Sequence, residues 1–253
     1  MELMNISFSG HIAVVTGGAQ GIGQAIARQL AEMGARVIIV DANMEKAAKT
    51  CREIGEERCG FYQVDLVDGD AVVRTMEKIV RENGRVDILI NNAGIVNTAD
   101  FTALTKEDWD RVLAIDLTAV FLTCQTLFRH MEANGGGRIV NVASIAGKVG
   151  GGYLGTAAYA TAKAGVISLT KSVAKAGASK GIYCNSVCPS LTRTPMTEIL
   201  TEEKEQIVLN ALALHRGAQP SEVANAVLFL ASDAASFITG ENINCDGGML
   251  MNG

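Results

Sequence analysis

The sequence predicts an α/β fold: one doubly wound parallel sheet of about seven strands, with helices on both faces. Short apolar runs alternate with longer amphipathic segments from end to end, which is the pattern of strands joined by helical crossovers. The runs are continuously apolar, as expected of strands that are buried on both faces. Hydrophobic residues make up 48% of the chain and aromatic residues only 5%, a balance that suits helices packed closely on a sheet. With no linker or low-complexity segment, residues 1–253 are interpreted as a single domain.

Each strand is predicted from a short apolar run that ends in small or polar residues. The expected strands are residues 12–16, 36–40, 58–64, 86–90, 139–143, 182–187 and 242–245. The expected helices are residues 22–33, 45–54, 70–82, 106–130, 159–177, 198–216 and 220–230. Ser221 is expected to cap the last helix. The segment 198–216 is interpreted either as a mobile lid or as an ordinary surface helix.

Charge and composition exclude several classes of function. The net charge is −5 and no long basic run occurs, which disfavours nucleic-acid binding. No uninterrupted apolar run approaches the ~18 residues that span a bilayer, and the N-terminus lacks the pattern of a secretory signal. The six cysteines are scattered and form no CxxC pair, so we expect buried free thiols and no metal site. A soluble cytoplasmic protein is therefore expected.

A glycine-rich segment, TGGAQGIG at residues 16–23, follows the first strand and opens a helix. Glycines let the backbone approach a pyrophosphate, and a helix N-terminus offers it free N–H groups and a positive dipole end. Asp41 ends the second strand, 20 residues after Gly21, where a carboxylate can hold both hydroxyls of an adenosine ribose. We expect a Rossmann-like NAD site, because Asp41 would repel the 2′-phosphate of NADP. The alternative is a glycine-rich turn that binds no ligand.

Three side chains point to acid–base chemistry at another strand end. Ser144 follows the strand 139–143, and Tyr159 and Lys163 follow four residues apart. On a helix this spacing places the phenol and the ammonium on one face. A nearby cation favours the phenolate and lowers the pKa of a tyrosine, so the three groups can move a proton on or off an alcohol. The alternative is an ordinary turn of surface helix.

Taken together, these segments resemble the short-chain dehydrogenase/reductase family over essentially the whole chain. The matching segments are Thr16–Gly23, Asp65, Asn91–Gly94, Ser144, Tyr159-x-x-x-Lys163, Asn185–Pro189, Thr194 and Asp246–Gly248. The resemblance implies a seven-stranded sheet, a nicotinamide cofactor and the reversible interconversion of an alcohol and a carbonyl. It also implies a homotetramer that acts on a small molecule.

The resemblance assigns roles to individual residues. Tyr159 would be the general acid/base, Lys163 would bind the nicotinamide ribose, and Ser144 would orient the substrate oxygen. Asp116 completes the catalytic set, in the middle of the long helix. The residues expected to bind the cofactor are Gly17, Gln20, Gly21, Ile22, Gly23, Asp41, Asp65, Leu66, Asn92, Ala93, Gly94, Tyr159, Lys163, Pro189, Thr192 and Thr194.

The sequence departs from the family pattern at three places. Asp116 stands where the family usually has asparagine; an ionised aspartate cannot donate a hydrogen bond, and its charge should raise the pKa of Lys163. The segment between Ser144 and Tyr159 is slightly longer than usual, and Tyr153 is expected to line the substrate pocket. Ser190 replaces the usual glycine after the proline, which should tighten that loop.

Three functions remain open at this point. The first is the NAD-dependent oxidation of a small secondary alcohol, polyol or sugar to its ketone. The second is the reduction of a 3-oxoacyl thioester, as by a 3-oxoacyl-[acyl-carrier-protein] reductase. Asp41 and the lack of a basic patch for an acidic carrier protein weigh against the second, since biosynthetic reduction usually draws on NADPH. The third is an NAD-binding regulator without catalysis, for which Asp116 is the only indication.

Overall fold

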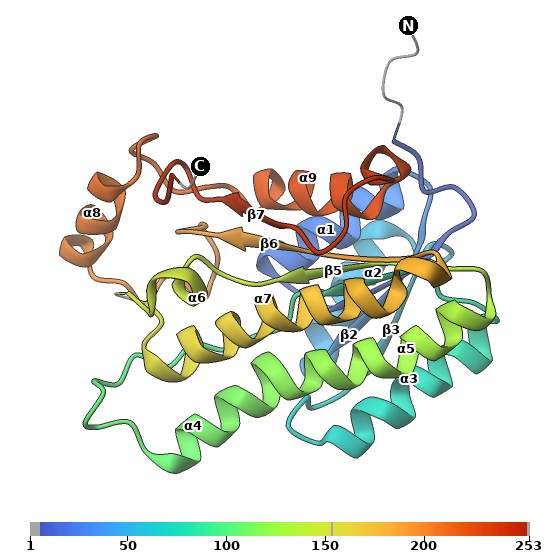
Figure 1. Cartoon of the computed structure of the whole chain (residues 1–253), viewed down its shortest axis with the longest axis horizontal. Coiled ribbons are helices and arrows are strands. Elements are labelled where there is room, and N and C mark those ends of the chain that lie inside the picture. The colour runs from blue at the N-terminus through green and yellow to red at the C-terminus, as the bar shows by residue number, and fades with distance from the viewer. Residues whose placement is uncertain (1–5, 153, 252–253) are drawn as a thin grey trace, which may run out of the picture.

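The computed structural model describes residues 6–152 and 154–251, and its centre is a sheet of seven parallel strands (Figure 1). The strand order is β3-β2-β1-β4-β5-β6-β7. The strands are β1 (Ile12–Thr16), β2 (Arg36–Asp41), β3 (Cys59–Gln63), β4 (Ile88–Asn91), β5 (Gly137–Val142), β6 (Ile182–Pro189) and β7 (Asn242–Cys245). The predicted doubly wound α/β fold is confirmed.

Helices cover both faces of the sheet (Figure 1). One face carries α1 (Gly21–Glu32), α2 (Met44–Ile54) and α9 (Pro220–Ala231), and the other carries α3 (Gly69–Asn83), α5 (Ala119–Ala133) and α7 (Ala157–Gly177). Three shorter helices lie near the carboxyl ends of the strands: α4 (Lys106–Leu113), α6 (Ala146–Val149) and α8 (Glu202–Ala211). Helix α6 was not predicted, and α8 is shorter than the predicted helix 198–216.

The sheet has a hydrophobic core on each face. This explains why the strand segments are continuously apolar in the sequence. Ala13 and Val15 of β1 pack into the core under α1 and α9, whereas Val14 between them packs into the core under α3 and α5. Successive side chains of a strand point to opposite faces, and here both faces are covered. All six cysteines are free thiols, and five of them are buried.

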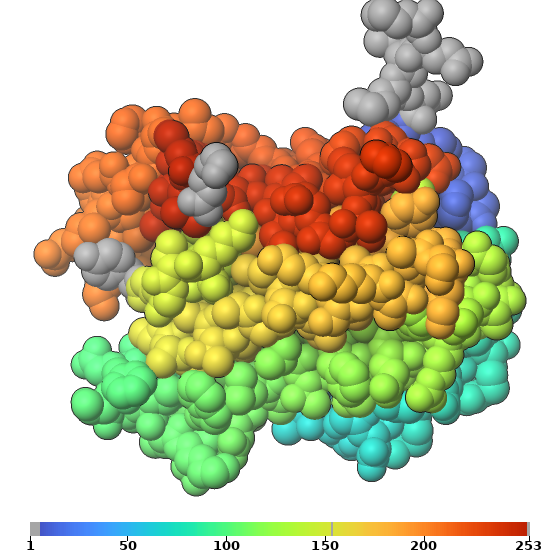
Figure 2. All heavy atoms as spheres, viewed as in Figure 1, coloured from blue at the N-terminus to red at the C-terminus, as the bar shows by residue number. Residues whose placement is uncertain are grey.

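The segment 106–133, predicted as one helix up to residue 130, is divided by a π-helical turn. This turn, η1 (Ala114–Thr118), joins α4 to α5 and contains Asp116. By length and composition the 28-residue run can cross a membrane. It packs instead against α3 and α7, as the ribbon and the space-filling view show (Figures 1 and 2), so we interpret it as a helix that covers the sheet.

The start of α9 differs from the prediction that Ser221 caps it. Gln219 is the N-cap and Pro220 occupies the first helical position, where its missing N–H leaves no bond unmade. Glu222 accepts a hydrogen bond from the Gln219 N–H at 2.8 Å and receives two more from the Arg216 guanidinium, each at 2.7 Å. The helix begins at residue 220 as predicted, but its N-cap lies two residues before the predicted cap.

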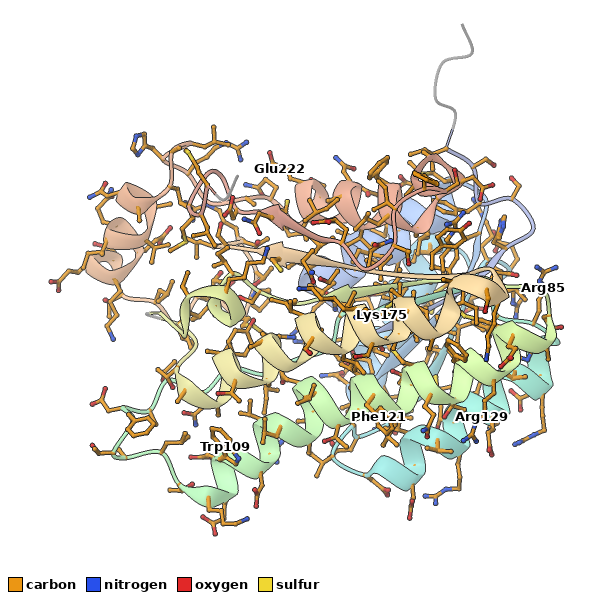
Figure 3. All side chains as sticks on the ribbon, viewed as in Figure 1. Arg85, Trp109, Phe121, Arg129, Lys175 and Glu222 are labelled. Atoms are coloured by element: carbon orange, nitrogen blue, oxygen red, sulfur yellow. The ribbon has the colours of Figure 1, made fainter. Side chains whose placement is uncertain are left out.

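The Glu222 carboxylate at the start of α9 (Figure 3) should stabilise the fold in a pH-dependent way. Hydrogen bonds from Arg216 and then from the Gln219 backbone lower the pKa of Glu222 from 4.5 to about 2. Because the folded-state pKa is depressed, the stabilisation is present above pH 4.5 and is lost as the pH falls toward about 2. Glu222→Gln should therefore lower the midpoint of thermal unfolding at neutral pH, and the difference should shrink below pH 4.5.

The matched control is Glu202→Gln, which removes an exposed carboxylate from the first turn of α8. Thermal unfolding followed by circular dichroism from pH 7 to pH 2.5 measures both variants. A Glu222→Gln effect of constant size across that range would contradict the ion-pair argument.

Candidate active site

The site lies where the winding of the sheet reverses, between the carboxyl ends of β1 and β4. In open α/β sheets this reversal leaves a crevice for ligands. A cavity of about 430 Å³ opens there and reaches across the ends of β1, β2, β4, β5 and β6. The sequence-predicted residues that line it are Gly17, Gln20, Gly21, Ile22, Asp41, Asp65, Leu66, Asn92, Ala93, Gly94, Ser144, Tyr159, Lys163, Pro189, Thr192 and Thr194. Gly23 and Asp116 are not among the lining residues.

The loop from β1 into α1 is suited to hold an anion. Gln20, the N-cap of α1, makes no side-chain hydrogen bond to the helix, and the first turn contains no acidic residue. The N–H groups of that turn are therefore left for a ligand, and the positive end of the helix dipole adds to them. Gly17 adopts a φ of 64°, and a β-carbon there would come within 2.7 Å of Ala93 Cα. These features fit the pyrophosphate of a dinucleotide.

Gly23 has a packing role beneath the cavity lining. A β-carbon at Gly23 would lie 2.1 Å from the carbonyl oxygen of Gly17 and 2.4 Å from Nδ2 of Asn92. The absence of a side chain therefore lets α1 begin directly beneath the loop. Glycine periodicity alone could not separate this role from ligand contact.

Asp41 is held in place at the end of β2. Its Oδ2 accepts a hydrogen bond from the Ala19 N–H at 3.0 Å, and its Oδ1 accepts one from the Asn43 N–H at 2.9 Å. The carboxylate still lines the cavity. Sequence reasoning missed Lys46, whose Nζ donates to Oε1 of Gln20 at 2.6 Å and brings a cation to the same end of the cavity.

Hydrogen bonds join the end of β4 to the glycine loop. The hydroxyl of Thr16 accepts from the N–H groups of Asn92 and Ala93 at 3.0 and 3.2 Å. Nδ2 of Asn92 donates to the carbonyl oxygens of Thr16 and Gly17 at 3.1 and 3.0 Å. The Asn92 side chain is thus used to shape the loop, and Ala93 and Gly94 present the backbone to the cavity.

The three predicted acid–base groups are brought together at one end of the cavity. Ser144, which follows β5, accepts a hydrogen bond from the Ala146 N–H at 3.1 Å. Tyr159 and Lys163 lie one turn apart on α7, and Nζ of Lys163 is 5.6 Å from the centre of the Tyr159 ring. Lys163 is only 3% exposed and donates to the carbonyl oxygen of Val142 at 3.1 Å. The spacing read from the sequence therefore places these groups as expected.

Asp116 lies behind Lys163, away from the cavity wall. Its side chain is fully buried, and its Oδ2 is 3.3 Å from Nζ of Lys163. Burial lowers the pKa of Lys163, but the Asp116 and Tyr159 charges outweigh it and the net pKa is raised. Burial also raises the pKa of Asp116, against the effect of Lys163. The expected effect of the aspartate on the lysine is confirmed.

The expected low pKa of Tyr159 is not found. Burial raises the pKa of the phenol, Lys163 acts in the opposite direction, and Asp116 adds to the increase. The lysine therefore has the predicted sign of effect, but desolvation and a second charge outweigh it. The sequence identifies the Asp116 charge but gives no measure of the desolvation of the phenol.

Beyond the acid–base groups the cavity wall is apolar. This wall is formed by Val149, Leu154, Met196, Leu200, Val208 and Met249. Leu200 and Val208 come from the segment 198–216, which therefore contributes to the cavity wall. Arg111 of α4 also lines the cavity and was not predicted. Tyr153, predicted to line the pocket, lies outside the described residues.

The loop after β6 is tied down by serine and threonine hydroxyls. Oγ of Ser190 donates to the carbonyl oxygen of Asp246 at 3.0 Å, which joins this loop to the C-terminal segment. Oγ1 of Thr197 donates to the carbonyl oxygens of Thr192 and Thr194 at 3.0 and 2.9 Å. Thr197 was missed, because its contacts are visible only once the loop is folded.

Comparison with known proteins agrees with this geometry. A family model described as Enoyl-(Acyl carrier protein) reductase matches residues 17–250. The chain belongs to the short-chain dehydrogenase/reductase family. It is 39% identical to a 3-oxoacyl-[acyl-carrier-protein] reductase of Aquifex aeolicus, covering 97% of this chain and all of that protein.

Two further proteins are similar to this chain. A cis-4-hydroxycyclohexanecarboxylate dehydrogenase of Sinomonas cyclohexanicum is 42% identical, over 97% of this chain and 98% of that one. The crystal structure of gox2181 superposes with a TM-score of 0.93 at 34% identity, covering 97% of each chain. The family membership establishes an oxidoreductase that acts on hydroxyl or keto groups with a nicotinamide cofactor.

The tight contact beneath the glycine loop generates a prediction. Gly23→Ala should push Gly17 and Asn92 away from residue 23. The free energy of unfolding should fall by about 1–3 kcal/mol, and dinucleotide binding should weaken. Urea unfolding and calorimetric titration with NAD measure the two effects. Gly60→Ala in β3 is the control, because a β-carbon there meets nothing within 4 Å. Equal behaviour of the two variants would contradict the packing role.

Proposed function

We propose that the protein reduces the keto group of a 3-oxoacyl thioester to a secondary alcohol, using NADH. The observation that carries the proposal is the apolar wall beside Ser144 and Tyr159, which suits an acyl chain. A polyol or sugar would need hydrogen-bond partners along that wall to replace those it has in water. The similarity to 3-oxoacyl-[acyl-carrier-protein] reductases supports the same substrate class.

The proposed roles of the residues follow from where they lie. When bound, the cofactor supplies the hydride that the carbonyl carbon receives. Tyr159 donates its phenolic proton to the carbonyl oxygen as negative charge develops there, so that the ketone gains one hydride and one proton. Ser144 donates a hydrogen bond to the same oxygen, and Lys163 stabilises the tyrosinate that remains. The pKa of the partly buried Tyr159 is raised by desolvation, which keeps the phenol protonated at neutral pH and ready to donate.

The choice of NADH rather than NADPH rests on Asp41. Its carboxylate is fixed by two backbone N–H groups at the adenine end of the cavity, where it would bind ribose hydroxyls and repel a phosphate. This residue also favours a second candidate function, the NAD-dependent oxidation of an apolar cyclic alcohol. That reaction would use the same residues in the reverse direction, and it fits the similarity to the cis-4-hydroxycyclohexanecarboxylate dehydrogenase.

We further infer that the enzyme is a cytoplasmic homotetramer with one catalytic domain. The six free thiols fit a reducing compartment. Apolar side chains remain exposed on helices that cover the sheet, among them Phe121 on α5 (Figure 3), which is 42% exposed. Light scattering after gel filtration measures the assembly, and a monomer would contradict this inference.

The test of the function is a screen for oxidation of NADH and NADPH. The purified protein is given short-chain and medium-chain 3-oxoacyl thioesters, cyclic ketones and ketoses, and the reverse reactions are assayed with NAD and the corresponding alcohols. We expect the highest kcat/KM with NADH and a thioester. Higher activity with a cyclic ketone would support the second candidate, and activity confined to sugars or polyols would contradict both.

Tyr159→Phe is the mechanistic variant in the same screen. It should lower kcat by at least about 100-fold, the low end for loss of a general acid, while the affinity for NADH stays unchanged. Undiminished turnover in this variant would overturn the proposed acid–base role.

Cofactor choice gives a separate prediction. Asp41→Asn keeps an oxygen for the Ala19 N–H but removes the charge. NADP should therefore bind to the variant at least about tenfold more tightly than to the wild type, equivalent to ~1.4 kcal/mol. Calorimetric titration of NAD and NADP against both proteins measures the ratio. Glu45→Gln, which removes a charge from the first turn of α2, should leave the ratio unchanged. An unaltered ratio in Asp41→Asn would contradict the role of Asp41.

A further inference from the structure

A buried ion pair joins Asp116 to Lys163 behind the cavity wall, with the carboxylate fully buried and the lysine 4% exposed at its side chain. Oδ1 of Asp116 accepts a hydrogen bond from the Ile95 N–H at 2.8 Å, and Oδ2 faces Nζ of Lys163 at 3.3 Å. Oδ2 has no hydrogen bond of good geometry among the described residues. Its partner is therefore the lysine charge, which lies within the distance at which two buried charges interact strongly.

The backbone around the pair is arranged to allow this approach. Asp116 lies in the π-helical turn η1, an irregularity that is frequent at functional sites. A β-carbon at Gly94 would come within 2.6 Å of Oδ2 of Asp116 and 3.2 Å of Nζ of Lys163. The glycine thus leaves the space in which the carboxylate meets the ammonium.

The charges of Lys163 and Asp116 both act on the phenol of Tyr159. Without Asp116 the phenol would lie beside one uncompensated cation, which favours the phenolate. With Asp116 ionised, its charge opposes that of Lys163 at the phenol. In the described structure the other titratable group that acts on Tyr159 is the Cys188 thiol of β6. Burial raises the pKa of that thiol, so it stays neutral.

We propose that Asp116 is a positioning residue that compensates the charge of Lys163 and so keeps Tyr159 protonated as a proton donor. Asp116 does not contact the cavity; it acts through the lysine. The consequence for direction rests on the proposed function: a phenol that holds its proton favours reduction of a ketone at neutral pH. The protonation of Tyr159 itself is a property of the chain and can be measured with no substrate present.

The experiment is a titration of Tyr159 by the near-ultraviolet absorbance of the phenolate in the cofactor-free protein. The chain has four tyrosines, so the signal of Tyr159 is taken as the difference between each protein and the same protein carrying Tyr159→Phe. In Asp116→Asn the phenolate of Tyr159 should appear at a pH at least about one unit lower than in the wild type, as expected for a charge of this proximity.

Asp87→Asn is the matched control. Asp87 is also buried, accepts a backbone N–H from Ile12 at 2.8 Å and pairs with Arg85, but it lies at the opposite end of the sheet (Arg85, Figure 3). A general effect of removing a buried carboxylate would shift both variants alike, and that result would overturn the proposal.

An unchanged titration in folded Asp116→Asn would overturn the proposal, since it would mean that the carboxyl group carries no charge that the phenol senses. If the asparagine variant does not fold, Asp116→Ser replaces it, because the serine hydroxyl can still accept the Ile95 N–H without an amide facing the lysine. In active protein the pH at which alcohol oxidation rises should move in the same direction as the titration. Failure of every substrate would refute the proposed function and leave the titration result standing.

Discussion

The hydrogen bonds between the ends of β1 and β4 are the constraint on which the cavity depends. These two strands are neighbours in the sheet although five elements separate them in the chain, and the chain leaves them toward opposite faces. The Thr16 hydroxyl and the Asn92 amide close the gap with four hydrogen bonds to backbone groups. Because buried backbone groups must be paired, this set fixes the glycine loop at one height above the sheet. The glycine loop and the acid–base groups are therefore held in a fixed position relative to each other.

A buried polar network fixes the helix that carries Tyr159 and Lys163. Nδ2 of Asn91 donates to Oδ1 of Asn141 at 2.9 Å, and Nδ2 of Asn141 donates to the Thr170 hydroxyl on α7 at 2.9 Å. These side chains lie in a core that is otherwise apolar, where an unpaired amide would be costly. A displacement of α7 along the sheet would break the hydrogen bond between Asn141 and Thr170. The sheet thus sets the height of the phenol relative to the strand end that carries Ser144.

The features that the sequence predicts well are those that depend on local pattern. Apolar runs flanked by glycine or polar residues located all the strands, and the four-residue spacing of Tyr159 and Lys163 placed both on one face of a helix. The features it predicts poorly depend on contacts between distant segments. The cap of α9 is an exception: Gln219, Pro220 and Glu222 form a local capping box, which the assignment of Ser221 as the cap missed. The raised pKa of Tyr159 arises mainly from burial of the phenol, with the Asp116 charge adding to it, and only the folded chain provides that burial.

The free energy of folding alone does not explain why Asp116 is buried beside Lys163. Removing two charges from water costs several kcal/mol per ion, and Oδ2 of Asp116 recovers little of it in hydrogen bonds. A neutral partner would leave the lysine as an uncompensated cation. On the proposed roles, the two ends of the cavity differ in charge. The free N–H groups of α1 face the anionic part of a dinucleotide. At the end that holds Tyr159, the Asp116 charge compensates that of Lys163 and leaves the surroundings of the phenol close to neutral. A proton donor gains from this separation, because a strong positive field at the phenol would release its proton to solvent before any carbonyl oxygen could accept it.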